Sequence, residues 1–160
     1  MGANELSMRL WHERELLEML LFKLEVQQLL LTAGSGRWAH FATREIEQVL
    51  DRLRTTGIAR VVDAAGVAED WGAPEGATLR ELIDHAPSTA WAEVLTDHMR
   101  VLTQLVAEIS QLRDTNVQQL NAVLRATQET IAGLGADSGE YTTAGVRARQ
   151  DAAHIVDTQM

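Results

Sequence analysis

The sequence contains no cysteine, only two prolines and a single lysine, and each scarcity excludes something. Without cysteine there are no disulfides and no thiolate metal sites, so the fold must be stabilised by packing. Because proline occurs only at Pro74 and Pro87, long stretches of chain are free to be helical. Alternating runs of β-branched and aromatic residues, which are typical of strands, are missing as well. The sequence therefore predicts an all-α fold.

Basic residues are also few, with 14 Lys and Arg against 23 Asp and Glu and a net charge of -9. This balance disfavours binding to the phosphates of nucleic acids unless a local basic patch overrides it. No such patch is apparent, because the arginines alternate with acids, as in Arg44-Glu45 and Asp51-Arg52. That alternation is typical of solvated helix faces. We expect no nucleic-acid partner.

The chain also lacks a long uninterrupted apolar run. Its most apolar stretch, residues 16–31, contains Glu18, Lys23 and Glu25, which a lipid-spanning helix does not tolerate. The first five residues lack the basic segment of a secretory signal. We therefore expect a cytoplasmic protein without direct membrane insertion.

The leucine spacing predicts a first helix over about residues 5–32. Leu10, Leu17, Leu24 and Leu31 are seven residues apart, which places them on one face of a helix. Gly34-Ser35-Gly36 follows, and glycine readily adopts the left-handed conformation that ends a helix. A turn this short predicts an antiparallel second helix.

That second helix is expected over about residues 37–69. Gly57 and Gly66 each cost roughly 1 kcal/mol relative to Ala in a helix interior, so we expect its last turns to be kinked or frayed. Its apolar face is predicted to consist of Trp38, Phe41, Val49, Leu53, Val61 and Ala65.

A connector rich in glycine and proline is expected over residues 70–77. Thr78 and Glu81 have the spacing of a capping box, which predicts a short helix that ends by Ala86. Trp71 and Trp91 flank this region, and we expect them to cover one end of the bundle.

The longest helix is predicted from Ser88 or Thr89 to about Leu134, because no Gly or Pro interrupts it before Gly133. At 1.5 Å per residue it is roughly 65 to 70 Å long, against about 40 Å for the first helix. Its far end must then project past the other helices or find another partner. The expected fold is an antiparallel bundle of three long helices, coiled-coil-like, with one short connecting helix.

The remaining residues, 135–160, contain few large apolar side chains. Such a segment buries too little surface to order itself. We therefore divide the chain into a helical bundle domain, residues 1–134, and a flexible C-terminal tail, residues 135–160.

Asn116 falls at the heptad position that Leu95, Leu102 and Ile109 occupy. A polar residue at such a seam often specifies register or partner number at a cost in stability. Alternatively, the apolar stripe drifts around the helix and leaves Asn116 exposed. The sequence leaves both possibilities open.

No pattern predicts catalysis, a cofactor or a metal. His12-Glu13-Arg14-Glu15-Leu16 begins like a zinc-binding HExxH helix, but Leu16 stands where the second histidine is needed. Gly34-x-Gly36-x-x-Ala39 resembles a dinucleotide fingerprint, which requires a preceding strand, whereas a helix precedes it here. The carboxylates lie on predicted exposed faces and not as a pair in a cleft.

The strongest sign of an interaction is the C-terminal part of the long helix, where apolar residues continue beyond the reach of the shorter helices. An uncovered stripe of this kind is typical of a surface that binds an amphipathic helix. The candidate partner-binding residues are Leu120, Val123, Leu124, Ile131 and Leu134.

Two stretches carry a resemblance to a known family that spans nearly the whole chain. Residues 10–18, LWHERELLE, and residues 20–25, LLFKLE, are similar to the opening helix of FlgN-type flagellar chaperones. The long helix with Asn116 and NAVL at residues 121–124, followed by Gly135, Tyr141 and Gly145, resembles that family's C-terminal half.

This resemblance implies a cytoplasmic chaperone that binds hook-associated proteins, which form the hook–filament junction, keeps them unpolymerised and delivers them to the flagellar type III export apparatus. It implies that no reaction is catalysed. It further implies that the long helix and the tail bind the cargo's terminal helical segment, and that a tyrosine near the C-terminus contacts the membrane-embedded export gate. Tyr141 is the matching residue.

Two alternatives remain open at this point. A homo-oligomeric coiled-coil structural or adaptor protein covers the same stripe with copies of itself. An enzyme is possible only if loops assemble a site that no linear motif reveals.

Overall fold

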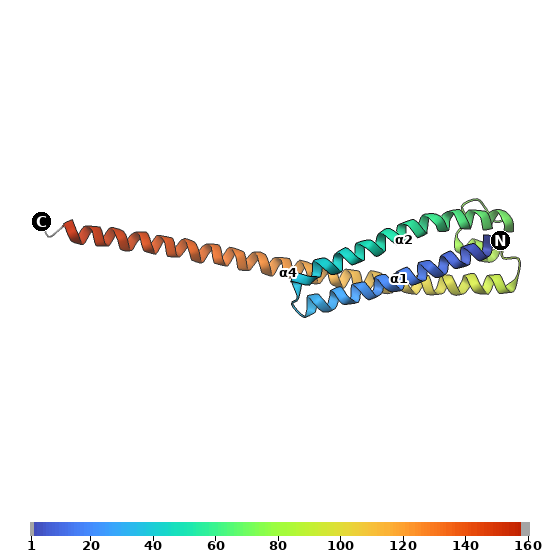
Figure 1. Ribbon diagram of the computed structural model, residues 1–160, viewed down its shortest axis with the longest axis horizontal. Coiled ribbons are helices and arrows are strands. Elements are labelled where there is room, and N and C mark those ends of the chain that lie inside the picture. Colours follow the sequence, from blue (N-terminus) through green and yellow to red (C-terminus); the bar gives the residue numbers. More distant parts are fainter. Residues whose placement is uncertain (1, 158–160) are drawn as a thin grey trace. The chain divides into compact units, whose positions relative to one another are not determined.

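The computed structural model describes the backbone of residues 2–157 and the side chains of residues 2–136. It contains four helices: α1 (Gly2–Thr32), α2 (Gly36–Trp71), α3 (Leu79–Asp84) and α4 (Thr89–Asp157) (Figure 1). No strand occurs among the described residues. The predicted all-α fold, with three long helices and one short one, is confirmed.

The chain divides into two compact units, Met1–Val117 and Gln118–Met160. The first unit contains α1, α2, α3 and the beginning of α4, and the second consists of the rest of α4. This division lies before the domain boundary that the sequence predicts at residue 134, and the functional boundary remains a prediction.

The first helix buries the face that its leucine spacing predicts. Leu10, Leu17, Leu24 and Leu31 are all buried, and Leu6 and Leu20 on the same face are buried with them. Each fully buried leucine contributes roughly 2 kcal/mol relative to an exposed one. The heptad pattern therefore supplies the central layer of the first unit.

The turn between α1 and α2 is formed by Gly34, whose φ angle is 71°. Its N–H donates to the Leu31 carbonyl (3.2 Å), and the Ser35 N–H donates to the Leu30 carbonyl (2.9 Å). This pair of bonds is the Schellman arrangement that ends a helix on a left-handed residue. The predicted tight turn is confirmed, and it makes α1 and α2 antiparallel.

The apolar face predicted for α2 is partly wrong. Trp38, Phe41 and Val61 are exposed, and Ala65 is exposed with them. The buried residues of α2 are Ala39, Ala42, Ile46, Val49, Thr56, Val67 and Ala68. Small side chains at Ala39 and Ala42 let the backbone of α2 approach its neighbours, and the large aromatics that dominate the sequence pattern are too bulky for that contact.

The α2 helix is also continuous through Gly57 and Gly66 to Trp71, so its last turns are not frayed. The two glycines cost about 2 kcal/mol together. Val67 and Ala68, which are completely or nearly buried just after them, offset this cost. The helix then ends at Gly72, which has a φ angle of 67°.

The connector and α3 follow the sequence closely. The Thr78 hydroxyl accepts from the Glu81 N–H (3.3 Å), and the Glu81 carboxylate accepts from the Thr78 N–H (2.7 Å). This is the predicted capping box. The Ser88 hydroxyl in turn accepts from the Trp91 N–H (3.3 Å), which places the start of α4 where the sequence predicts it.

The core of the first unit has a cluster at each end. One contains Leu6, Leu10, Val67, Leu82 and Leu95, and the partly buried Trp71 packs against it. The Trp71 and Trp91 rings lie 6.2 Å apart, as expected for residues that cover this end. The other cluster contains Leu20, Leu24, Ile46 and Val49, and Ile109 and Leu112 of α4 pack on it.

The α4 helix extends to Asp157, whereas the sequence predicts that it ends near Leu134. Glycines at positions 133, 135, 139 and 145 lower helix propensity, but no proline forces the helix to stop. Whether residues 135–160 form a flexible tail remains a prediction.

Asn116 is buried between α4 and α1, so the alternative in which it is exposed is wrong. Its side-chain N–H groups donate to the Leu24 carbonyl (2.9 Å) and to Gln27 Oε1 (3.0 Å). Gln27 Nε2 donates to Thr43 Oγ1 (3.0 Å), and the Thr43 hydroxyl donates to the Ala39 carbonyl (3.0 Å). One chain of hydrogen bonds thus crosses α4, α1 and α2.

We expect Asn116→Ala to lower the free energy of unfolding by about 1–2 kcal/mol, because Gln27 Oε1 is left buried without a donor. The loss is moderated because Asn116 Oδ1 is itself buried without a partner in the native chain. Chemical denaturation followed by circular dichroism measures the change. The exposed Asn121→Ala is the matched control, with a change within about 0.5 kcal/mol. Equal effects of the two changes contradict a role for this network.

Candidate partner-binding site

The candidate partner-binding side chains lie on α4 within the second unit, and those with described side chains are largely exposed. Val123, Leu124, Ile131 and Leu134 have exposed fractions between 43% and 66%. Leu120 is partly exposed. Four large aliphatic side chains within twelve residues are thus open to solvent, which is unusual because such groups are normally buried.

These residues share one side of α4. At about 100° per residue, Leu120, Val123, Leu124, Ile131 and Leu134 fall within an arc of about 100°. This is the width of the apolar face of an amphipathic helix that packs against a partner. We refer to these five residues as the α4 stripe.

The polar residue in the middle of the α4 stripe has its hydrogen-bonding group satisfied. The Thr127 hydroxyl donates to the Val123 carbonyl (2.9 Å), and the neighbouring Thr130 hydroxyl donates to the Ala126 carbonyl (2.9 Å). Because each hydroxyl is used within its own helix, an apolar partner can pack on the threonine methyl groups without leaving a buried donor unpaired.

The helix surface around the stripe carries little charge. Between residues 118 and 136, Arg125 and Glu129 are the charged residues. At 100° per residue both lie on the side of the helix opposite the stripe. The α4 stripe is therefore suited to apolar contact and offers little for recognition of a charged ligand.

Tyr141 lies outside the residues whose side chains the structure describes. Its place in the site therefore remains a prediction.

A family model described as FlgN protein matches residues 1–149. The chain belongs to the FlgN family. The family consists of flagellar export chaperones, so the general role that the sequence suggests is confirmed. No curated protein matches the chain, and no solved structure does either.

One contact in this FlgN-family chain has the distance of a catalytic pair. Ser7 Oγ lies 3.2 Å from Nε2 of His98, which is almost completely buried. A Ser–His pair at this distance is the first requirement for an activated nucleophile. Sequence reasoning missed this contact because the two residues are 91 positions apart on different helices.

The other ring nitrogen of His98 shows why this pair is not suited to nucleophilic catalysis. Arg14 Nη1 lies 3.4 Å from His98 Nδ1. A guanidinium can only donate, so Nδ1 must accept and the ring proton must sit on Nε2. Nε2 then donates to Ser7 and cannot remove its proton. In a catalytic triad a carboxylate holds the opposite tautomer.

Arg14 connects His98 to its surroundings. Its guanidinium pairs with Asp97 (3.1 Å) and stacks over the Trp11 ring at 4.0 Å. The Trp11 ring also meets His98 edge-on at 5.2 Å. Burial, and next the Arg14 charge, hold the pKa of His98 below its ordinary value, although Asp97 opposes the shift. These contacts join α1 to α4, which indicates a structural role.

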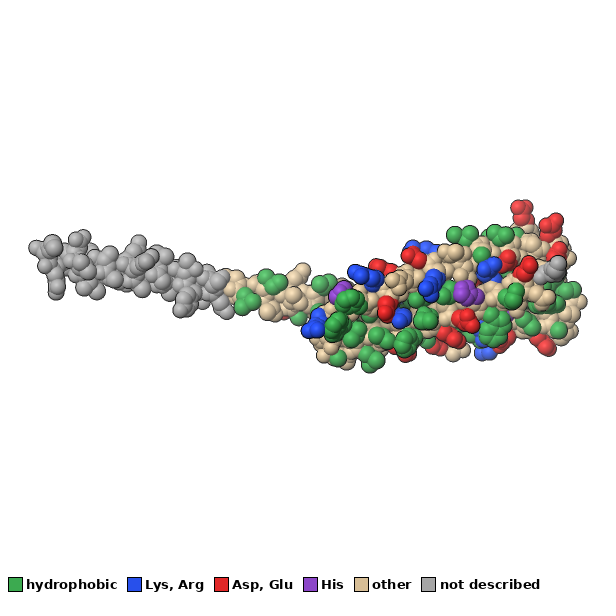
Figure 2. Space-filling model, in the orientation of Figure 1, with side chains coloured by type: hydrophobic (Ala, Val, Ile, Leu, Met, Phe, Trp, Pro, Cys, Tyr) green, Lys and Arg blue, Asp and Glu red, His purple; other side chains and the backbone are tan. Residues whose placement is uncertain are grey.

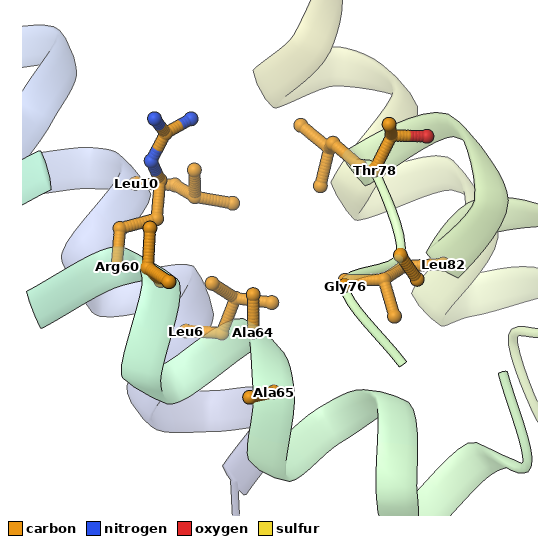
Figure 3. A pocket seen from close by; sticks show the side chains of 11 residues that line it. Leu6, Leu10, Arg60, Ala64, Ala65, Gly76, Thr78 and Leu82 are labelled. Atoms are coloured by element: carbon orange, nitrogen blue, oxygen red, sulfur yellow. The ribbon is translucent and has the colours of Figure 1, made fainter. Parts of the chain in front are cut away.

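One cavity of about 270 Å³ lies between α1, α2 and the segment before α3 (Figure 3). Leu10, Arg60 and Ala64 face Gly76 and Leu82 across it. Arg60 is the charged residue that lines it, and Arg60 Nε lies 3.3 Å from Glu13 Oε2. The lining offers no nucleophile next to a base and no pair of carboxylates.

Within the described part of the chain, no three His, Asp or Glu side chains come together as metal ligands. No stretch within the described helices combines the length and hydropathy that a membrane span requires.

We expect the stability of this FlgN-family chain to fall as the pH drops below about 6.5. The ordinary pKa of histidine is 6.5 and that of folded His98 is lower, so the unfolded chain binds a proton first and acid favours unfolding. Above that pH, neutral His98 makes its full contribution to the free energy of unfolding.

Denaturation curves between about pH 7.5 and pH 5 measure this effect. His98→Gln should flatten the pH dependence, whereas His85→Gln, which changes an exposed histidine, should leave it unchanged. If His98→Gln leaves the pH dependence of stability unchanged, that dependence does not come from His98.

Proposed function

We propose that this FlgN-family chain acts in the cytoplasm as the export chaperone of a hook-associated protein and holds the terminal helical segment of that cargo on the α4 stripe. The observation that carries the proposal is the set of exposed aliphatic side chains at helical spacing from Leu120 to Leu134. The chain acts by binding alone and catalyses no reaction.

The chemistry of the stripe fits a cargo helix that otherwise self-associates. A helix that assembles with its neighbours in a filament junction presents an apolar face, and such a face can pack into the α4 stripe by the same i, i+3, i+4 pattern. Covering the face prevents premature assembly. The stripe is about 21 Å long, from the 14 steps between Leu120 and Leu134 at about 1.5 Å each, so the contact is short enough to allow release.

The C-terminal segment is proposed to complete this site. If residues 135–160 order around the cargo, part of the binding free energy is spent on their conformational entropy, which lowers affinity for a given contact area. Reversible binding of this kind suits a chaperone that must hand its cargo to the export machinery.

Truncating the α4 stripe should weaken cargo binding without unfolding the protein. We expect Leu124→Ala and Ile131→Ala each to raise the Kd for a hook-associated protein at least tenfold, or about 1.4 kcal/mol, as for central residues of an interface. Calorimetry or pull-down with purified hook-associated proteins measures this.

Arg125→Ala, on the opposite side of the same helix, is the matched control and should leave the Kd unchanged. Unchanged cargo binding in both stripe variants would falsify the proposed site. Light scattering of the chain alone separates the alternative: if the stripe pairs copies of this chain in a structural coiled coil, Leu124→Ala dissociates a stable oligomer.

Tyr141 is proposed to contact the export gate and not the cargo. We expect Tyr141→Ala to bind cargo with the affinity of the native chain but to lose binding to the cytoplasmic domain of the export gate and to reduce export. Tyr141→Phe distinguishes the ring from the hydroxyl. If Tyr141→Ala weakens cargo binding as much as Leu124→Ala does, the residue belongs to the cargo site instead.

A further inference from the structure

A second apolar surface lies on α1, on the side away from the bundle core. Five large apolar side chains of α1 have exposed fractions between 44% and 68%. At about 100° per residue they fall within an arc of about 80°, opposite the buried leucines. We call them the α1 stripe: Met8, Trp11, Met19, Phe22 and Leu29.

The α1 helix is therefore apolar on two opposite sides. A helix of this composition is typically covered on both, whereas α1 is covered here on one. Figure 2 shows hydrophobic side chains gathered over α1, especially toward the α1–α2 turn. An exposed group of this extent indicates an interaction surface.

Every basic residue of α1 is already paired with an acid on another helix. Arg9 pairs with Asp63 (2.9 Å), Arg14 with Asp97 (3.1 Å) and Lys23 with Glu45 (2.8 Å). The acids of these pairs lie on α2 and α4, while Arg14 also lies over the Trp11 ring (4.0 Å) and Lys23 near the Phe22 ring (5.5 Å) at the borders of the stripe. Each Arg and Lys of α1 therefore already has an acidic partner within the chain.

Carboxylates, in contrast, remain free beside the stripe. Glu18 and Glu25 are exposed and lie one heptad apart at the edge that faces α4, and neither forms an ion pair within the described residues. Glu15, which at 100° per residue lies within the arc of the stripe itself, has only the weak contact with His12 (3.7 Å). Glu25 also lines a hollow of about 290 Å³ between α1 and α4, together with Glu108 from α4. The edge of the α1 stripe is thus acidic.

This charge distribution decides between possible occupants. A second copy of the chain brings the same free carboxylates to the contact and no free cation, so like charges oppose pairing through this face. A partner helix with Lys or Arg beside its apolar face instead neutralises Glu18, Glu25 and Glu108.

We propose that the α1 stripe is the docking surface for a basic amphipathic helix of another protein. From Met8 to Leu29 the stripe is about 32 Å long, which matches a helix of about six turns. The occupant lies along α1 with its apolar side on Trp11, Phe22 and Leu29 and its cations toward α4.

This surface differs from the α4 stripe in position and in chemistry. The α4 stripe has no charge beside its apolar side chains, so its binding should respond weakly to salt. The α1 stripe carries free carboxylates at its edge, so its affinity and association rate should fall as salt rises. The two proposals therefore succeed or fail separately.

The test uses two synthetic helical peptides of 21 residues as probes. Both carry the same leucine face, and the positions beside it are Lys in one peptide and Glu in the other. Fluorescence anisotropy measures their Kd for the full chain. We expect the Lys peptide to bind at least tenfold tighter, and this preference to shrink between about 0.05 and about 0.5 M salt.

Two sets of variants locate the binding. Phe22→Ser with Leu29→Ser, and separately Glu18→Lys with Glu25→Lys, should each weaken the Lys peptide about tenfold or more. Glu47→Lys with Glu69→Lys makes the same change in net charge on exposed residues of α2 and should have little effect. Leu124→Ser with Ile131→Ser should also leave this binding intact.

Three results overturn the proposal. Equal weakening by the α2 charge reversal shows unspecific attraction to an acidic protein. Weakening by the α4 variant, without an effect at Phe22 and Leu29, moves the site to α4. Dissociation of a homo-oligomer by Phe22→Ser with Leu29→Ser, seen by light scattering, makes a second copy the occupant. All substituted side chains are exposed, and circular dichroism verifies that the variants remain folded.

Discussion

The hydrogen-bonded chain from Asn116 through Gln27 and Thr43 to the Ala39 carbonyl determines how the three long helices align. Leucine layers alone tolerate sliding by one heptad, because every seventh position presents a similar side chain. A buried amide that must meet one carbonyl and one glutamine does not tolerate it. The network therefore favours one register of the helices over its one-heptad alternatives, at some cost in stability, because Asn116 Oδ1 stays unpaired.

In this alignment, one apolar side of α1 is buried and the other is exposed. One side faces the core and consists of the buried leucines Leu6, Leu10, Leu16, Leu17, Leu20, Leu24 and Leu31. The other side, the α1 stripe, faces solvent with free carboxylates beside it. The cations of α1 pair with acids on α2 and α4, so that Glu18 and Glu25 are left without an ion pair beside the stripe. Surface ion pairs such as Lys23–Glu45 contribute little to stability, at most about 1 kcal/mol, but they determine the charge that a partner meets.

In this FlgN-family chain the described residues present apolar surfaces to solvent. The closest approach to catalytic geometry, Ser7 with His98, is held by Arg14 in a tautomer that makes histidine a donor. That arrangement joins two helices. The α4 stripe instead combines exposed aliphatic groups with hydroxyls already satisfied within the helix, which suits temporary packing of an apolar helix.

The sequence by itself determined the helices, their capping residues, the leucine face of α1 and the positions of the α4 stripe, because these depend on local spacing within one helix. Only the tertiary structure decided the buried face of α2, where small alanines displaced Trp38 and Phe41, and the burial of Asn116, which the heptad position left open. The contact of His98 with Ser7 and the free carboxylates beside the α1 stripe were likewise tertiary results. Each depends on which residues of different helices meet, and spacing within one helix carries no information about that.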